Sequence, residues 1–184
     1  MMANGELHYA PLTANNDPSR VLDLGTGTGI WAINFADEHP NSVVIGTDLS
    51  PIQPTWLPPN CKFYIEDIES PWNYGPEEHF DFIHGRGLCG SIADWKKLLL
   101  QAYENLKPGG WLETQEFDTD VRSDDGTHGL ATNLASWLEE LKGASERFGK
   151  PLKMAHQLKG WMEEVGFVDV EQKIVRVSDC CQLF

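Results

Sequence analysis

Basic residues are scarce in this sequence, and their scarcity argues against a protein that grips nucleic acid through a basic patch. The 184 residues include 14 lysines and arginines against 28 aspartates and glutamates, so the net charge is -14. An acidic surface repels a phosphate backbone, and we therefore predict no direct contact with nucleic acid. The simplest interpretation of the excess acid is solubility.

Cysteines and long hydrophobic runs are also few. The cysteines have neither metal-ligand spacing nor the pattern of a disulfide framework; they are Cys61, Cys89, Cys180 and Cys181. We therefore predict no metal, reduced thiols and an intracellular protein, cytoplasmic or nuclear. No apolar run approaches the roughly 20 residues of a membrane span, and no secretory signal opens the chain, so we expect no membrane contact.

The most informative run that the sequence does contain is VLDLGTGTG, over residues 21–29. It predicts a buried strand leading directly into a turn rich in glycine. Apolar residues at helical spacing follow from Ile30 to Ala36, and Pro40 ends that helix. A strand, a G-x-G-x-G turn and a helix in this order are typical of a nucleotide-like ligand site, because glycines allow the backbone to approach the ligand closely.

Two acidic residues stand where a nucleoside would need them. Asp48 closes the apolar stretch 43–47, 19 residues after Gly29, a spacing at which a carboxylate can accept hydrogen bonds from ribose hydroxyls. Asp67 closes a third predicted strand, and we expect that strand to end beside the adenine of the nucleoside. A turn-forming role for Asp48 and a helix-capping role for Asp67 stay open as alternatives.

Two classes of enzyme use such a site, the nicotinamide oxidoreductases and the methyltransferases that use S-adenosylmethionine. The dinucleotide fingerprint G-x-G-x-x-G fails, since Ile30 stands three residues after Gly27. Asp23 suits a ligand with a cationic amino-acid end better than an anionic pyrophosphate. We therefore predict S-adenosyl-L-methionine as the cofactor, bound by Asp23, Gly25, Thr26, Gly27, Gly29, Asp48, Leu49, Asp67, Ile68 and Gly85.

Strands and helices alternate along the chain, which predicts an α/β domain, a mostly parallel sheet with helices on both faces. We divide the chain into an N-terminal extension, 1–20, and a domain, 21–184, with a sixth strand at 167–177. The four prolines in 50–60 forbid a regular helix there, and we expect Trp56 and Leu57 to turn toward the core. Helices are expected at 94–106, at 130–141 and from 151 to 165.

No residue is assigned as catalytic, because methyl transfer from a sulfonium can proceed by alignment of acceptor and methyl alone. His84, Glu113 and Glu116 are candidate bases if the acceptor must lose a proton. A solvated loop is an equal alternative for His84 and Arg86, and solvated or capping roles are the alternatives for the two glutamates. Since Glu113 and Glu116 are three residues apart, at most one can face a pocket.

Four motifs in order resemble the class I methyltransferases: VLDLGTGTGIWA, VIGTDLSPIQPTWLPPN, FDFIHGRGLCGSIADW and LKPGGWLETQEF. More narrowly they resemble the fungal group that includes the velvet-associated global regulator of secondary metabolism. The resemblance implies the Rossmann-like methyltransferase fold, S-adenosylmethionine as cofactor and methyl transfer to an unidentified acceptor, a small secondary metabolite or a protein. It also permits a catalytically silent subunit that acts through a regulatory protein partner.

The resemblance further implies that residues 118–150 form an insertion on the acceptor side. Class I enzymes end with an antiparallel seventh strand between the fifth and the sixth, and only seven residues follow Val177 here. We therefore expect that final strand to be missing and the chain to be shortened at both ends relative to the family. A sheet without it would have unpaired edges and would be prone to associate.

Overall fold

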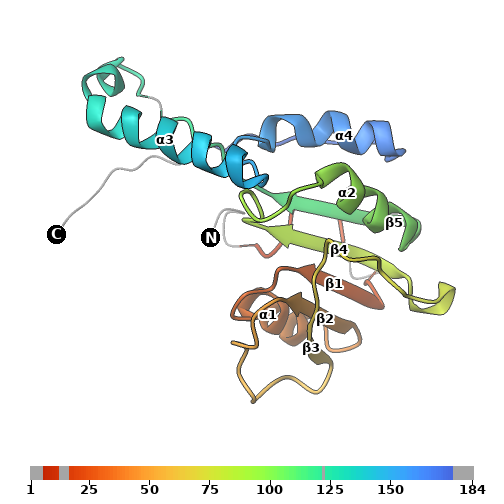
Figure 1. The fold of residues 1–184 in the computed structure, drawn as a ribbon. Helices are drawn as coiled ribbons and strands as arrows, with labels where there is room; N and C mark the ends of the chain where they lie inside the picture. The colour runs from red at the N-terminus through yellow and green to blue at the C-terminus, as the bar shows by residue number, and fades with distance from the viewer. Residues whose placement is uncertain (1–5, 13–16, 122, 176–184) are drawn as a thin grey trace.

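A computed structural model describes residues 6–12, 17–121 and 123–175, and its centre is a sheet of five parallel strands in the order β3-β2-β1-β4-β5 (Figure 1). The strands are β1 (Arg20–Leu24), β2 (Val43–Asp48), β3 (Cys61–Ile65), β4 (Phe80–Arg86) and β5 (Leu106–Gln115). The parallel α/β prediction is confirmed. Strand order reverses between β1 and β4, and ligands of open parallel sheets bind beyond the carboxyl ends of the strands at such a reversal.

Helices cover both faces of the sheet, as expected (Figure 1). Helix α1 (Ile30–Glu38) packs on one face, where Trp31 and Phe35 contact Val21 and Phe82. Helices α2 (Trp95–Glu104) and α4 (Leu158–Val165) pack on the other face. The two apolar clusters alternate along each strand because neighbouring side chains of a strand point to opposite faces.

The N-terminal segment packs on the α1 face. Leu7 and Leu12 contact the cluster on that face, and the Leu7 carbonyl accepts a hydrogen bond from Trp31 Nε1 at 2.7 Å. The N–H groups of Tyr9 and Ala10 donate to Glu113 Oε2 at 2.8 and 2.7 Å. Residues 6–12 are therefore tied to α1 and β5.

Helix α3 (Thr132–Phe148) lies away from the sheet (Figure 1). It follows a loop and the short 3-10 helix η2 (Thr127–Leu130), and none of its residues is buried. Its expected apolar face is formed by Leu134, Trp137, Leu138 and Leu141, but the first two and Leu141 are exposed. The sequence pattern therefore predicted a helix near its observed position, and most of its expected apolar face is exposed, with Leu138 half-buried.

The predicted sixth strand is wrong within the described residues. Residues 167–175 form no strand, and residues 176 and 177 lie outside the described part of the chain. Asp169 has a φ of 54°, which interrupts an extended run, and Val168 and Ile174 are each 82% exposed. Alternating apolar residues favour a strand only where a neighbouring strand receives their backbone hydrogen bonds. No antiparallel pairing occurs in the described sheet.

Four smaller expectations need correction. Trp56 is 87% exposed rather than turned toward the core. Strand β4 runs through 84–86, so His84 and Arg86 lie in a strand and not in a loop. The helix expected at 94–106 ends at Glu104, because β5 already begins at Leu106. The helix expected from 151 to 165 is divided into a short 3-10 helix, η3 (Ala155–Gln157), and the α-helix α4. A further 3-10 helix, η1 (Pro76–Glu78), precedes β4.

Candidate functional site

The turn after β1 is built from three glycines with positive φ, a conformation that other residues rarely adopt. The φ angles are 60° at Gly25, 58° at Gly27 and 79° at Gly29. A Cβ on Gly25 would lie 2.5 Å from Leu88 Cδ2, and one on Gly29 would lie 2.4 Å from Phe63 Cζ. A Cβ on Gly27 would meet nothing within 4 Å. Two glycines therefore allow tight packing, and Gly27 faces open space in which a ligand can approach the backbone.

Asp48, at the end of β2, lies directly beside this open turn. Its Oδ2 accepts the Gly27 N–H at 2.8 Å and its Oδ1 accepts the Ser50 N–H at 2.9 Å. Each carboxylate oxygen has two lone pairs, so both can accept a further hydrogen bond from a ribose hydroxyl. The turn-forming alternative is thus observed, and it leaves the predicted ribose contact possible.

Asp23 lies beneath the turn rather than at its surface. It is 3% exposed, and Thr26 Oγ1 donates to its Oδ2 at 2.5 Å. His84 Nδ1 lies 2.8 Å from its Oδ1, and the Nδ1–H is the donor because a carboxylate can only accept. The interior position means that Asp23 first of all orients Thr26 and His84; the predicted contact to a ligand amino group stays a prediction.

His84 is buried, so the solvated-loop interpretation is wrong for this residue. Its ring stacks on that of Trp31 with 3.8 Å between centroids and 4° between planes. Its Nε2 is buried and has no hydrogen-bond partner among the described residues. Sequence reasoning did not foresee the Trp31 stack, because the two residues come from elements far apart in the chain.

Asp67 and Ile68 line a cavity of about 290 Å³ between the segment that follows β3 and the strands β1 and β2. Leu24 and Thr47 form part of its lining, and Thr47 Oγ1 is buried without a partner among the described residues. Asp67 lies two residues after β3, and its Oδ1 accepts the Glu69 N–H at 2.9 Å. No helix begins directly after Asp67, so this bond closes a turn and the helix-capping alternative is wrong; the exposed carboxylate can still reach a ligand in the cavity.

The last two predicted residues differ in their surroundings. Leu49 is 68% exposed beside Asp48, as a side chain that covers a ligand would be before the ligand binds. Gly85 is buried in β4, and a Cβ there would lie 3.0 Å from Leu88 Cδ1. Gln53, which sequence reasoning missed, donates to the Gly27 carbonyl at 2.7 Å and so fixes the outer side of the turn.

The two candidate glutamates hold different parts of the backbone. Glu113 binds the N-terminal segment on the α1 face, as described above. Glu116 accepts the N–H groups of Leu88 and Cys89 at 2.9 and 2.8 Å. Burial raises the pKa of Glu116 above its ordinary value, although the two N–H donors act in the opposite direction. Both carboxylates already serve as backbone acceptors, in line with the capping alternative.

The two buried cysteines are not nucleophiles at neutral pH. Burial raises the pKa of Cys61 to about 11 and that of Cys89 to about 12, so neither is a thiolate at neutral pH. Both are free, whereas Cys180 and Cys181 lie outside the described residues. Within residues 6–12, 17–121 and 123–175, no three His, Cys, Asp or Glu side chains are grouped to hold a metal ion.

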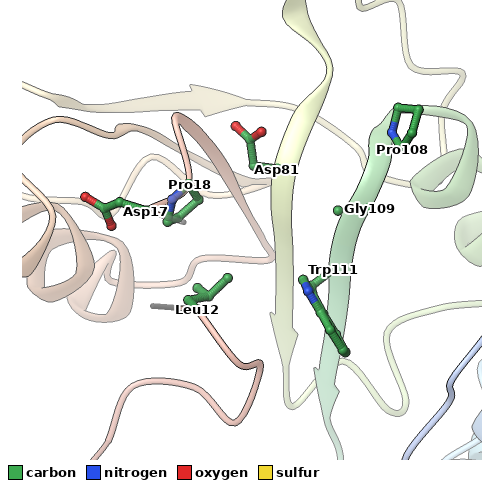
Figure 2. A pocket seen from close by; sticks show the side chains of 8 residues that line it. Leu12, Asp17, Pro18, Asp81, Pro108, Gly109 and Trp111 are labelled. Carbon is green, nitrogen blue, oxygen red and sulfur yellow. The ribbon is translucent and has the colours of Figure 1, made fainter. Parts of the chain in front are cut away.

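A second, smaller hollow lies at the opposite edge of the sheet, where the strands begin (Figure 2). Asp17, Asp81, Gly109 and Trp111 belong to its lining. Asp81 accepts a hydrogen bond there from the Arg20 N–H at 2.8 Å and forms an ion pair with Lys107. Ligands of open parallel sheets bind beyond the carboxyl ends of the strands, so we place the site at the other edge.

Residues 4–172 match the protein family described as "Methyltransferase domain". The chain belongs to this family. The sequence-based resemblance to the class I methyltransferases, and more narrowly to the fungal regulator group, is thereby confirmed.

The fungal relatives include two with names that bear on function. The secondary metabolism regulator LAE1 of Cochliobolus heterostrophus is 41% identical over 176 residues, which is 94% of this chain and 57% of the relative. The methyltransferase pytC of Aspergillus terreus is 42% identical over 166 residues, 89% of this chain and 50% of the relative. The chain thus spans about half the length of these curated relatives.

A solved structure shows the same fold. Phosphoethanolamine N-methyltransferase 2 of Haemonchus contortus, in complex with S-adenosyl-L-methionine, aligns with a TM-score of 0.60 over 83% of this chain and 34% of that one. At 23% identity the similarity establishes the fold alone. In the described part of the chain, no helix is both long and apolar enough to cross a membrane.

Proposed function

We propose that this chain is an S-adenosylmethionine-dependent methyltransferase domain whose acceptor is a small secondary metabolite or a protein. One observation carries the proposal: in a member of the methyltransferase family, the open backbone of Gly27 and the carboxylate of Asp48 meet at 2.8 Å at the carboxyl edge of the sheet. The names of the fungal relatives support a link to secondary metabolism.

The residues of this edge fit the proposed cofactor. Gly27 lets the backbone approach it, Asp48 can hold the ribose, and Asp67 and Ile68 line a cavity that can take the adenine. When bound, the cofactor supplies a methyl group on an already activated sulfonium. The chain then has to bind the cofactor and the acceptor, align them and exclude water. A base is not required for the transfer itself.

The occupied carboxylates agree with a positioning mechanism. Glu113 and Glu116 each accept two backbone N–H groups, so using either as a base would release a segment of chain. One ring nitrogen of His84 has no partner within the described part of the chain, but it is buried beneath Trp31. We therefore assign no general base.

A second function stands beside the first: a cofactor-binding regulatory subunit that acts through protein contacts without turnover. The exposed apolar residues of α3 and the word "regulator" in the names of several relatives favour it. We further propose an intracellular location, cytoplasmic or nuclear, consistent with the free thiols of Cys61 and Cys89. Direct binding to nucleic acid or to a membrane is not part of either proposal.

Calorimetric titration of the purified chain with S-adenosylhomocysteine and with NAD tests the function. We expect saturable binding of S-adenosylhomocysteine and none of NAD, because an acid at position 23 and an Ile30 in place of the third fingerprint glycine disfavour a pyrophosphate. Release of S-adenosylhomocysteine from S-adenosylmethionine in the presence of fungal extract would then separate an enzyme from a silent subunit. Binding of NAD alone would contradict both proposals.

A further inference from the structure

We propose that Glu116 is a positioning residue for the cofactor turn and that it acts through Leu88. This inference rests on the proposed function, because it concerns the affinity of the same site for S-adenosylhomocysteine. Glu116 follows the end of β5, and the turn follows β1. Strand β4 lies between β1 and β5 in the sheet, so the loop after β4 connects Glu116 with the turn. The contacts of that loop carry the argument.

The carboxylate of Glu116 fixes the backbone of the loop. Its Oε1 accepts the Leu88 N–H at 2.9 Å, and its Oε2 accepts the Cys89 N–H at 2.8 Å. Hydrogen bonds to an ionised acceptor are roughly twice as strong as neutral ones. Two of them on consecutive residues fix both the position and the orientation of that peptide.

The side chain of Leu88 transmits this position to the turn. It is 5% exposed and fills the space that side chains would need at Gly25 and Gly85. A Cβ on Gly25 would lie 2.5 Å from Leu88 Cδ2, and one on Gly85 would lie 3.0 Å from Leu88 Cδ1. Leu88 is thus wedged between the first glycine of the turn and the end of β4, and a displacement of Leu88 would leave Gly25 without support.

Three further backbone hydrogen bonds constrain the loop. The Gly87 N–H donates to the Gln115 carbonyl at 3.0 Å, the Gly90 N–H to the Pro151 carbonyl at 3.1 Å, and the Ser91 N–H to the Leu88 carbonyl at 2.9 Å. Both glycines have positive φ, 67° and 77°, so the backbone on either side of Leu88 and Cys89 is conformationally permissive. Among the described residues, Glu116 is the acceptor that holds the N–H groups of Leu88 and Cys89 themselves.

Glu116→Gln tests the inference with little change in shape. The amide keeps one acceptor oxygen but turns an NH₂ group toward the second N–H, so one of the two hydrogen bonds is lost. We expect the Kd for S-adenosylhomocysteine to rise about five- to tenfold, less than for the loss of a direct hydrogen bond to a charged group, because Glu116 acts on the site only through Leu88. Asp81→Asn is the matched control, since Asp81 also accepts a backbone N–H but lies at the opposite edge of the sheet; its Kd should stay within about twofold of the wild type.

A double-mutant cycle shows whether Glu116 acts through Leu88. Leu88→Ala should also weaken binding, and the pair Glu116→Gln with Leu88→Ala should bind no more weakly than Leu88→Ala alone. Additive losses, or a Glu116→Gln variant that binds like the wild type, would overturn the inference. If Glu116→Gln does not fold, Glu116→Asp, which withdraws the oxygens by one methylene, decides the same question. Failure of the wild type to bind S-adenosylhomocysteine would instead refute the proposed function.

Discussion

The carboxylate of Asp48 joins the turns that follow β1 and β2. One oxygen fixes Gly27 and the other fixes Ser50, so the residue organises the backbone on both sides of the proposed ribose position. Its side chain has intermediate exposure, which leaves the outer lone pairs open to a ligand. Its substitution should therefore affect both the shape of the turn and the direct contact.

Asp48→Ala removes these acceptors. A hydrogen bond to a charged group contributes roughly 1.5–3 kcal/mol, so we expect the affinity for S-adenosylhomocysteine to fall about 10- to 150-fold. Asp48→Asn keeps one acceptor oxygen and should lose less. Calorimetry on the two variants and the wild type makes the comparison, and an unchanged Kd for Asp48→Ala would show that the ribose is held elsewhere.

Residue-level prediction worked where a role follows from local chain geometry. Gly25, Gly27 and Gly29 show the positive φ values that the G-x-G-x-G pattern favours. The pattern could not foresee that Asp23 would lie buried against His84, because β1 and β4 are joined only in the folded sheet. Leu88 and Gln53 lie within the motifs that carry the family resemblance, but the local pattern assigns neither a role, and their contacts to the turn became visible only in three dimensions.

The ion pairs of Asp120 connect elements that lie between β5 and α4. Asp120 accepts hydrogen bonds from Lys142 of α3 at 2.6 Å and from Lys153 at 2.7 Å. These two lysines lower the pKa of Asp120 from 3.8 to about 2. The carboxylate therefore connects the loop after β5 to the exposed helix and to the segment before α4.

Asp120→Asn should destabilise the chain at neutral pH by roughly 0.2–1 kcal/mol for each ion pair lost. Because the folded-state pKa is lowered, the contribution of Asp120 is fully present above pH 3.8 and is lost as the pH falls toward 2. Urea unfolding at pH 7, 4 and 3 should show the difference from the wild type shrinking in acid. Asp37→Asn is the control, since Asp37 is exposed on α1 and forms no ion pair among the described residues; a difference that grows in acid would contradict the assignment.

At the scale of helices and strands, the sequence predicted those elements that pack against a neighbouring element. Strand β2 covers the apolar stretch 43–47 that ends at Asp48, and α2 begins at Trp95, next to the expected start at residue 94. The expected strand at 167–177 and the packing of α3 depended on neighbours that the described structure does not provide. An apolar period predicts which face can be buried, and it does not say what will cover that face.

For the whole molecule, exposed apolar surface and net charge act against each other. Trp137 is 57% exposed on α3, with Leu134 and Leu141 on the same face. Strand β5 has β4 on one side and no second neighbour in the described sheet. The net charge of -14 opposes contact between copies, and salt screens that repulsion.

We therefore predict that the chain associates and that association increases with salt. Size-exclusion chromatography at low and high salt should show a shift toward larger species. Trp137→Arg should shift the elution back toward the monomer, whereas Trp56→Arg, at a tryptophan that is 87% exposed and lies outside α3, should not. A monomer under all conditions, with cooperative melting in the ordinary range of about 45–65 °C, would show that the open surfaces matter less than we infer.

The most direct test of the central claim, that the turn after β1 is the cofactor site, is titration of Gly27→Val with S-adenosylhomocysteine. Its φ of 58° and the open space around it mean that valine adds strain and points a side chain toward the ligand without contacting the rest of the protein at Cβ. Gly109→Val is the matched control, because Gly109 has a φ of 80°, equally open surroundings and a place at the opposite edge. We predict that Gly27→Val keeps the far-UV circular dichroism of the wild type and loses binding, while Gly109→Val binds normally. Binding of S-adenosylhomocysteine to Gly27→Val with wild-type affinity would contradict the account.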